Sequence, residues 1–273
     1  MAIFFLSLMD ACVKAVSPTM GTFPALWARY SGQLIVVLIV IAPRLKQVVR
    51  TNALGLQIAR SLLLLSATFF FFMGLARIGL AEATAVLVLN PLFITLGGAL
   101  FLGEKLGIRR IMAIVVAFAG AMLIIQPGLD TFDPAALFPL GGALFFAGYA
   151  VITRAVGKTE DPWTSLFYTA CVGGVLMTFT APLYWTWPGP ASATQMAGIS
   201  IFGTLGQFLL IRAYSQAEAG VLAPFGYMGL IYATLIGLFV FAEVPGWSTI
   251  VGALVIAAAG IYVWWRETRQ IRR

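Results

Sequence analysis

The sequence predicts an all-helical, polytopic membrane protein with ten transmembrane helices, arranged as two inverted repeats of five. Three observations predict this fold. Hydrophobic residues make up 61% of the chain and charged residues only 10%, whereas a soluble domain typically has about 25% charged residues. The apolar residues fall into ten separate runs, and the last five runs resemble the first five. The mean hydropathy of +0.97 is typical of a chain that lies mostly in lipid.

Most of the apolar runs are long enough to cross a bilayer, whose ~30 Å hydrocarbon core needs roughly 20 helical residues. We expect spans near residues 2–17, 24–43, 55–75, 82–102, 109–126, 136–153, 164–185, 195–212, 221–242 and 247–265. The first span reaches only ~24 Å at ~1.5 Å per residue, so either this helix is short or the true start lies upstream. Because no basic segment precedes it and no small-residue cleavage site follows it, we do not expect a cleaved signal peptide.

The basic residues predict how the spans are oriented. The chain has 17 Lys and Arg residues, and most of them fall in the segments that are cytoplasmic if the N-terminus is inside. Arg77 is the one basic residue expected in the outer loops. Because such an excess marks the cytoplasmic side, we expect both termini in the cytoplasm and the protein in a bacterial inner membrane. The net charge of +7 then reflects topology and contact with membrane lipid, and no nucleic-acid partner is expected.

The two halves of the chain align at a pair of short acidic turns. Each of these turns, LGEKLG at 102–107 and AEVPGW at 242–247, separates a long apolar run from a run rich in small residues. Matching Glu104 with Glu243 brings these runs into register. Because each half holds an odd number of spans, the second half enters the membrane in the opposite sense, and substrate is expected near the midplane where the halves meet. The expected repeats are residues 1–126 and 136–267.

This arrangement resembles the drug/metabolite transporter superfamily, in particular its EamA-type branch with ten spans. The two acidic turns carry the resemblance, together with APFGY at 223–227 in the ninth span. The resemblance covers essentially the whole chain. It implies a secondary transporter that moves a small organic metabolite by alternating access of two five-helix halves.

Within this superfamily, the chain is similar to a bacterial subgroup that contains riboflavin and S-adenosylmethionine importers. The similarity rests on SLMDACVKA at 7–15, Arg29 in the second span, Arg60 at the start of the third, and NPLF at 90–93. It implies uptake of a riboflavin-like or S-adenosylmethionine-like compound. Export of amino acids or drugs is the alternative, because members related at this level carry different metabolites in different directions.

Four charged side chains fall inside the predicted spans, where each costs roughly 2.5–3.5 kcal/mol on insertion scales. Asp10 and Lys14 are four residues apart, so they share a helix face and can pair. They either line a gate or neutralise each other, with Lys14 reaching the outer interface. Arg29 is expected to contact substrate or to bond to Asp10 and backbone carbonyls. Arg60 is expected to reach the cytoplasmic interface, with a gating role as the alternative.

Asn90 and Pro91 are the polar and helix-breaking point of the fourth span, close to the bilayer midplane. Pro91 removes one backbone hydrogen bond and frees a carbonyl, and Asn90 offers both donors and an acceptor. We expect a ligand locus here, with a simple packing kink as the alternative. The ninth span carries Pro224, Gly226 and Gly229, which allow bending or close packing. Because Pro224 does not align with Pro91, the two kinks are not expected to be symmetry mates.

Aromatic and amide side chains complete the candidate substrate cavity. Tyr149, Tyr227 and Gln207 join Asn90 and Arg29 as candidate substrate contacts. The two tyrosines lie deep in their spans, whereas tyrosines near span ends more often lie at the membrane interface. A cavity of this composition suits a flat, partly polar molecule that is neutral or anionic.

The sequence lacks the residues that most membrane-embedded enzymes need. It contains no histidine, and its two cysteines lie in apolar spans, where a thiol behaves as a small hydrophobe. We therefore expect no enzymatic activity, no metal site and no cofactor. Transport of a small-molecule metabolite is the expected function, for which a monomer is sufficient. A channel or a purely structural membrane protein is the remaining alternative.

Overall fold

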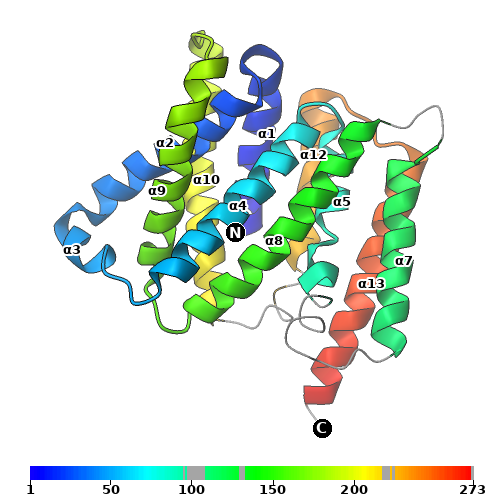
Figure 1. Ribbon diagram of the computed structural model, residues 1–273. Coiled ribbons are helices and arrows are strands. Elements are labelled where there is room, and N and C mark those ends of the chain that lie inside the picture. Colours follow the sequence, from blue (N-terminus) through cyan, green and yellow to red (C-terminus); the bar gives the residue numbers. More distant parts are fainter. Residues whose placement is uncertain (95, 97–107, 129–132, 217–221, 223–224, 272–273) are drawn as a thin grey trace.

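The computed structural model describes residues 1–94, 96, 108–128, 133–216, 222 and 225–271, and this part of the chain is helical without strands (Figure 1). The α-helices are α1 (Ala2–Met20), α2 (Thr22–Ile41), α3 (Leu45–Val48), α4 (Leu54–Leu75), α5 (Leu80–Leu87), α7 (Ile108–Ile125), α8 (Leu137–Val156), α9 (Pro162–Thr180), α10 (Pro190–Gln216), α12 (Met228–Phe241) and α13 (Trp247–Ile271). Three 3-10 turns, η1 (Ala42–Arg44), η2 (Pro134–Ala136) and η3 (Ala181–Tyr184), lie at helix ends.

The predicted membrane spans are found as helices. Within the described residues, seven helices are long and apolar enough to cross a bilayer. Three shorter apolar helices cover Leu80–Ile94, Ile111–Ile125 and Met228–Phe241, which correspond to the fourth, fifth and ninth predicted spans. The all-helical polytopic fold is therefore confirmed. The first span is longer than expected, since α1 continues to Met20 with Pro18 inside its last turn.

Large apolar side chains cover the outward surface of the helix bundle. The most exposed include Phe179, Leu183, Phe239, Val240 and Leu254, which come from several different helices. A soluble monomer rarely exposes apolar area on this scale, because it would drive aggregation. The surface is therefore suited to contact with lipid acyl chains.

The helix packing repeats itself between the two halves. The five spans of the first half (α1, α2, α4, α5, α7) correspond in order to those of the second (α8, α9, α10, α12, α13). The contact of α4 with α8 therefore corresponds to that of α10 with α1, and the contact of α4 with α9 to that of α10 with α2. α2 with α9, α5 with α12 and α7 with α13 each join a helix to its counterpart in the other half. Figure 1 shows α4 beside α8 and α7 beside α13. These contacts are preserved when the first five spans are exchanged with the last five, which is the pattern of a two-repeat fold.

Glycines let the α7 and α13 backbones approach closely. A Cβ added at Gly120 would lie 2.9 Å from the Gly252 carbonyl oxygen and 3.0 Å from Ile256 Cγ1. Any larger residue at Gly120 would therefore push α13 away. Small residues at helix interfaces serve this purpose in membranes, where packing replaces the hydrophobic effect between helices.

The fourth span is broken near its middle. α5 ends at Leu87, a two-residue turn follows, and the helix resumes over 90–94. The Leu89 amide donates to the Val86 carbonyl at 3.2 Å, three residues back rather than four. Because Pro91 has no amide hydrogen, it cannot restore the regular bond to the Leu87 carbonyl. The sequence thus predicted the break, which lies just before the Asn-Pro pair.

The ninth span is broken at the matching position. Residues 225–226 are helical, Tyr227 forms a turn, and α12 begins at Met228. The alignment of the two acidic turns matches Val88 in the first break with Tyr227 in the second. The two breaks therefore fall at matching positions of the two halves. The expectation that the kinks at Pro91 and Pro224 are not symmetry mates stays a prediction. Pro224 itself lies outside the described residues.

Candidate functional site

A cavity of about 890 Å³ lies between the two halves and is open at one end. This volume is within the range of small-molecule sites, about 300–1,000 Å³. The polar and charged lining residues include Ser7, Asp10, Arg29, Thr68, Thr84, Asn90, Arg154, Lys158, Gln207 and Tyr214. Apolar residues of the same helices, among them Phe71, Phe72 and Phe146, supply the rest of the wall. An apolar wall with a few convergent polar groups is typical of a site for a small organic molecule.

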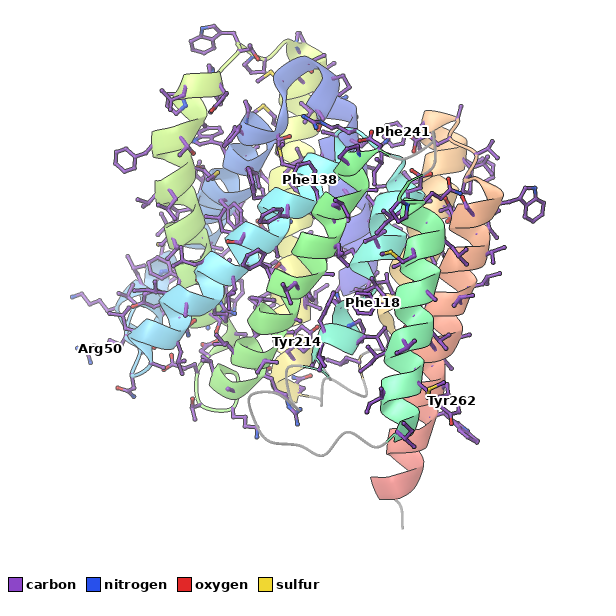
Figure 2. The ribbon with its side chains drawn as sticks, turned by 45° about the vertical axis from the view of Figure 1, so that its right-hand side comes forward. Arg50, Phe118, Phe138, Tyr214, Phe241 and Tyr262 are labelled. Carbon is purple, nitrogen blue, oxygen red and sulfur yellow. The ribbon has the colours of Figure 1, made fainter. Side chains whose placement is uncertain are left out.

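The mouth of the cavity lies at the end of the bundle where α1 begins and α8 and α10 end. Met1 and Phe225 are exposed there, and Arg154 and Lys158 also line this end. In Figure 2, Tyr214 near the mouth lies at the end of the molecule opposite Phe241. The cavity therefore opens on the face that carries basic residues of the α8–α9 connection.

A chain of hydrogen bonds crosses the cavity wall and joins three helices. The Arg29 guanidinium on α2 donates to Gln207 Oε1 on α10 at 3.2 Å. The Gln207 amide then donates to the Tyr149 hydroxyl on α8 at 2.6 Å. Arg29 also contacts the Met9 sulfur on α1. Three of the candidate contact residues are thus connected, although only Arg29 and Gln207 line the cavity, and Tyr149 lies behind Gln207.

Arg29 is held by aromatic faces and an amide rather than by a carboxylate. Its side chain is 4% exposed, and its Cζ lies 5.5 Å from the Tyr30 ring centroid and 5.9 Å from that of Phe72. Arg29 Nε has no hydrogen-bond partner among the described residues. Asp10 lines the same cavity, but the structure records no hydrogen bond or ion pair between the two. The expected bond from Arg29 to Asp10 is therefore replaced by the bond to Gln207.

Arg60 is expected from the sequence to reach the cytoplasmic interface, but in the structure it does not. It is fully buried and donates to Thr169 Oγ1 at 2.6 Å and to the Ser165 carbonyl, and it lies 3.5 Å from Thr153 Oγ1. Its Cζ lies 5.5 Å from the Tyr149 ring centroid. These acceptors on α8 and α9 bind the two terminal nitrogens of the guanidinium inside the bundle, whereas Arg60 Nε has no partner among the described residues. Arg60 is not among the cavity-lining residues, and it connects α4 to α8 and α9.

Lys14 pairs with a residue other than the expected Asp10. Its Nζ lies 2.7 Å from Glu243 Oε1, in the connection between α12 and α13, and donates to the Ile78 carbonyl at 2.8 Å. The expectation of an Asp10–Lys14 pair is therefore wrong. Neighbours on one helix face were the only partners visible in the sequence, whereas Glu243 is brought to Lys14 by packing of the two halves.

The helix breaks supply further cavity residues. Asn90 and Pro91 line the cavity where the fourth span resumes, and Gly226 and Gly229 line it from the ninth span. Tyr227 does not line it. Its ring points at α13, where a Cβ added to Gly260 would lie 2.7 Å from Tyr227 Cζ.

Thr84 is a cavity residue that the sequence reasoning missed. It is 8% exposed, it lines the cavity, and its hydroxyl has no partner among the described residues. A single threonine in an apolar run carries no signal by itself. Its place about one turn before the helix break becomes visible only once α5 is packed against α12 and α8.

Comparison with known proteins identifies relatives along the whole chain. The profile of the EamA-like transporter family matches residues 1–126 and 133–265. A riboflavin transporter of Vibrio cholerae is 30% identical over 248 residues, covering 88% of this chain and 83% of that protein. An S-adenosylmethionine uptake transporter of Rickettsia felis is 28% identical over 275 residues, covering 99% and 94%. A pseudopaline exporter of Pseudomonas aeruginosa is 27% identical over 267 residues, covering 96% and 92%.

The fold also matches a solved structure. A protein solved by crystallography superposes with a TM-score of 0.71 at 17% identity, covering 98% of this chain and 97% of the other. At this identity the likeness establishes the fold alone.

Proposed function

We propose that this chain, which belongs to the EamA-like transporter family, carries a small organic metabolite across the bacterial inner membrane by alternating access of its two halves. The protein is a multi-pass membrane transporter and not an enzyme. The binding site and the substrate path are the subject of the proposal. The substrate enters the cavity between the halves, and rocking of one half against the other opens this cavity to either side in turn.

The buried guanidinium of Arg29 is the observation that carries the proposed site. An ionisable side chain inside the membrane is costly and is retained for a function. Arg29 lies on the cavity wall without a bonded carboxylate, and its Nε is unsatisfied among the described residues. A substrate carbonyl or carboxylate oxygen would satisfy it. Gln207 and Asn90 would add amide hydrogen bonds, and the Phe72 ring would pack on a flat part of the molecule.

The class of substrate follows from this wall. A flat, partly polar molecule that is neutral or anionic fits an arginine, two amides and several aromatic rings. Uptake of a riboflavin-like or S-adenosylmethionine-like compound is our leading proposal, because relatives named for those two activities align over most of the chain. Riboflavin matches the neutral class, whereas S-adenosylmethionine carries a net positive charge, which Asp10 on the same wall would offset. Export is the second proposal, because a relative of similar identity is named a pseudopaline exporter.

We further propose how the chain lies in the membrane. The halves would span residues 1–126 and 136–267, with both termini in the cytoplasm, so that the open mouth with Arg154 and Lys158 faces the cytoplasm. Each half contributes helices to the cavity wall, so one chain encloses the whole site and a monomer is sufficient.

A ligand screen on the purified protein tests the substrate proposal. Flavins, S-adenosylmethionine, nucleosides, amino acids and quaternary amines are added in turn, and the thermal unfolding midpoint is measured. A compound that binds the folded protein raises its stability by mass action. The compound selected is then tested for uptake into liposomes. Saturable, competable uptake supports a transporter, whereas flux that rises linearly with concentration would support a channel, and the absence of flux a structural protein.

A further inference from the structure

The cavity is closed at the end opposite its mouth by an apolar plug. Along α1 its lining ends at Asp10, and on α5 it begins at Thr84. Just beyond these residues, Val13 and Ala83 are fully buried and Leu80 is 1% exposed. We call Val13, Leu80 and Ala83 the plug. The plug comes from α1 and α5 of the first half, and these helices pack against α10, α12 and α13 of the second.

A group of charged and polar side chains lies directly beyond the plug. Lys14 is one helical turn past Asp10, or about 6 Å along α1. Its Nζ lies 2.7 Å from Glu243 Oε1, and its side chain is 14% exposed against 33% for Glu243. The other carboxylate oxygen of Glu243 accepts from the Leu80 amide at 3.0 Å. Glu243 therefore binds the start of α5 as well as α1.

A second acidic residue makes a parallel connection. Glu82 Oε2 accepts from the Gly79 amide at 3.3 Å, capping α5. Glu82 Oε1 accepts from the Thr249 hydroxyl on α13 at 3.2 Å. We call Lys14, Glu82, Glu243 and Thr249 the polar latch. Two of its members belong to the first half and two to the second, so the latch fastens the halves together at this end.

We propose that the polar latch is the gate on the closed side of the transporter, with the Lys14–Glu243 ion pair as its principal bond. This proposal rests on the proposed function, because a gate is needed only if the halves move. A path from the cavity to this face requires α1 and the start of α5 to separate from the α12–α13 connection, which breaks the pair.

The position of the pair makes it reversible. Both side chains are partly exposed, so their separation lets water reach each charge and recovers hydration that the closed state gives up. Because the pair is only partly buried, its net contribution to the closed state is modest. The pair therefore favours the closed state without fixing it.

The test uses a single reporter cysteine in the cavity. Ser7 lies on α1, lines the cavity and is 6% exposed, and Ser7→Cys changes one atom. The two native cysteines are first replaced (Cys12→Ala, Cys171→Ala). The full-length protein is placed in vesicles of each orientation, and the rate of labelling by a membrane-impermeant maleimide is measured from each face.

Two single variants each remove the ion pair with little change in shape. Glu243→Gln keeps an oxygen for the Leu80 amide. Lys14→Met keeps a long unbranched side chain but removes the ammonium, whose Nζ lies 5.9 Å from the Phe241 ring centroid. The matched control is Glu160→Gln, because Glu160 also accepts from a backbone amide, that of Asn52, but lies at the opposite end of the bundle. The swap Lys14→Glu with Glu243→Lys restores opposite charges.

We call the side of the membrane onto which the cavity opens the cavity face, and the opposite side, where the polar latch lies, the latch face. With the latch intact, we expect the reporter to be labelled rapidly from the cavity face and slowly from the latch face. Each single variant should raise the rate from the latch face roughly tenfold, which corresponds to about 1.4 kcal/mol. The Glu160→Gln control should leave both rates unchanged. The charge swap should bring the latch-face rate back toward that of the intact latch.

The outcomes separate the gate from the transport function. Unchanged latch-face labelling in both single variants, with normal labelling from the cavity face, would overturn the latch and leave the transporter proposal standing. Labelling from neither face would show that the cavity is not a water-filled path, which overturns the proposed function. If one single variant fails to insert, the other decides, because each removes the same pair.

Discussion

Arg29 and Gln207 are 178 positions apart in the chain, yet the Arg29 guanidinium donates to the Gln207 amide oxygen at 3.2 Å on the wall of the cavity. Arg29 belongs to the first half and Gln207 to the second. The bond therefore crosses the boundary between the two halves, which we propose to move against each other. A substrate bound at Arg29, as we propose, would compete with or add to this bond and so influence how the halves meet.

Replacing Arg29 tests the proposed substrate contact. We expect Arg29→Ala to lower uptake at least about tenfold, because a hydrogen bond to a charged group contributes about 1.5–3 kcal/mol. Arg29→Lys is the matched variant, which keeps the charge but loses the forked geometry, and it should retain part of the activity. Uptake into liposomes is compared at equal amounts of folded protein. Normal uptake by Arg29→Ala would show that the site is misplaced.

The amide of Asn90 gives a second, independent test of the cavity. Asn90→Ala should abolish transport while expression and thermal stability remain near those of the unaltered chain, because Asn90 lies on the cavity wall at a helix break. The control is Asn52→Ala, because Asn52 is not among the cavity-lining residues and its variant should transport normally. Equal uptake by both variants would rule out a substrate role for Asn90.

Arg60 should behave differently from Arg29. Because Arg60 is fully buried behind the cavity and bonded to α8 and α9, Arg60→Met should lower the free energy of unfolding by about 2–3 kcal/mol. Ligand affinity of the folded fraction should stay within a few-fold of the original. Thermal unfolding with and without the ligand separates the two effects. A large loss of affinity with unchanged stability would place Arg60 in the binding site instead.

Close packing of α7 on α13 predicts a stability effect at Gly120. A methyl group there would lie 2.9 Å from the Gly252 carbonyl oxygen, and such overpacking typically costs about 1–3 kcal/mol. Gly120→Ala should therefore lower the unfolding midpoint in detergent. Gly55→Ala is the control, since an added Cβ at Gly55 meets no atom within 4 Å. Equal midpoints for the two variants would contradict the close approach.

The number of spans and their duplication could be predicted because lipid imposes simple rules. A hydrocarbon core of fixed thickness requires apolar runs of fixed length, and positive charge marks one side. The break in the fourth span was also predictable, since Pro91 cannot donate a backbone hydrogen bond. These properties depend on residues that are close together in the chain.

The partners of the intramembrane charges could not be predicted in the same way. Lys14 pairs with Glu243, and Arg60 with residues of α8 and α9, across long stretches of chain. The sequence offers Asp10 as a neighbour of Lys14, but helix packing between the halves decides the pairing. Glu104, the alignment partner of Glu243, lies outside the described residues, so its side of the membrane stays a prediction.

Blocking the cavity shows whether substrate passes between the two halves. The compound selected by the stability screen is supplied to liposomes containing the Ser7→Cys protein, before and after the reporter is modified with a bulky maleimide from the cavity face. We expect saturable uptake that disappears when labelling is complete. Undiminished uptake by fully labelled protein would contradict a substrate path between the two halves.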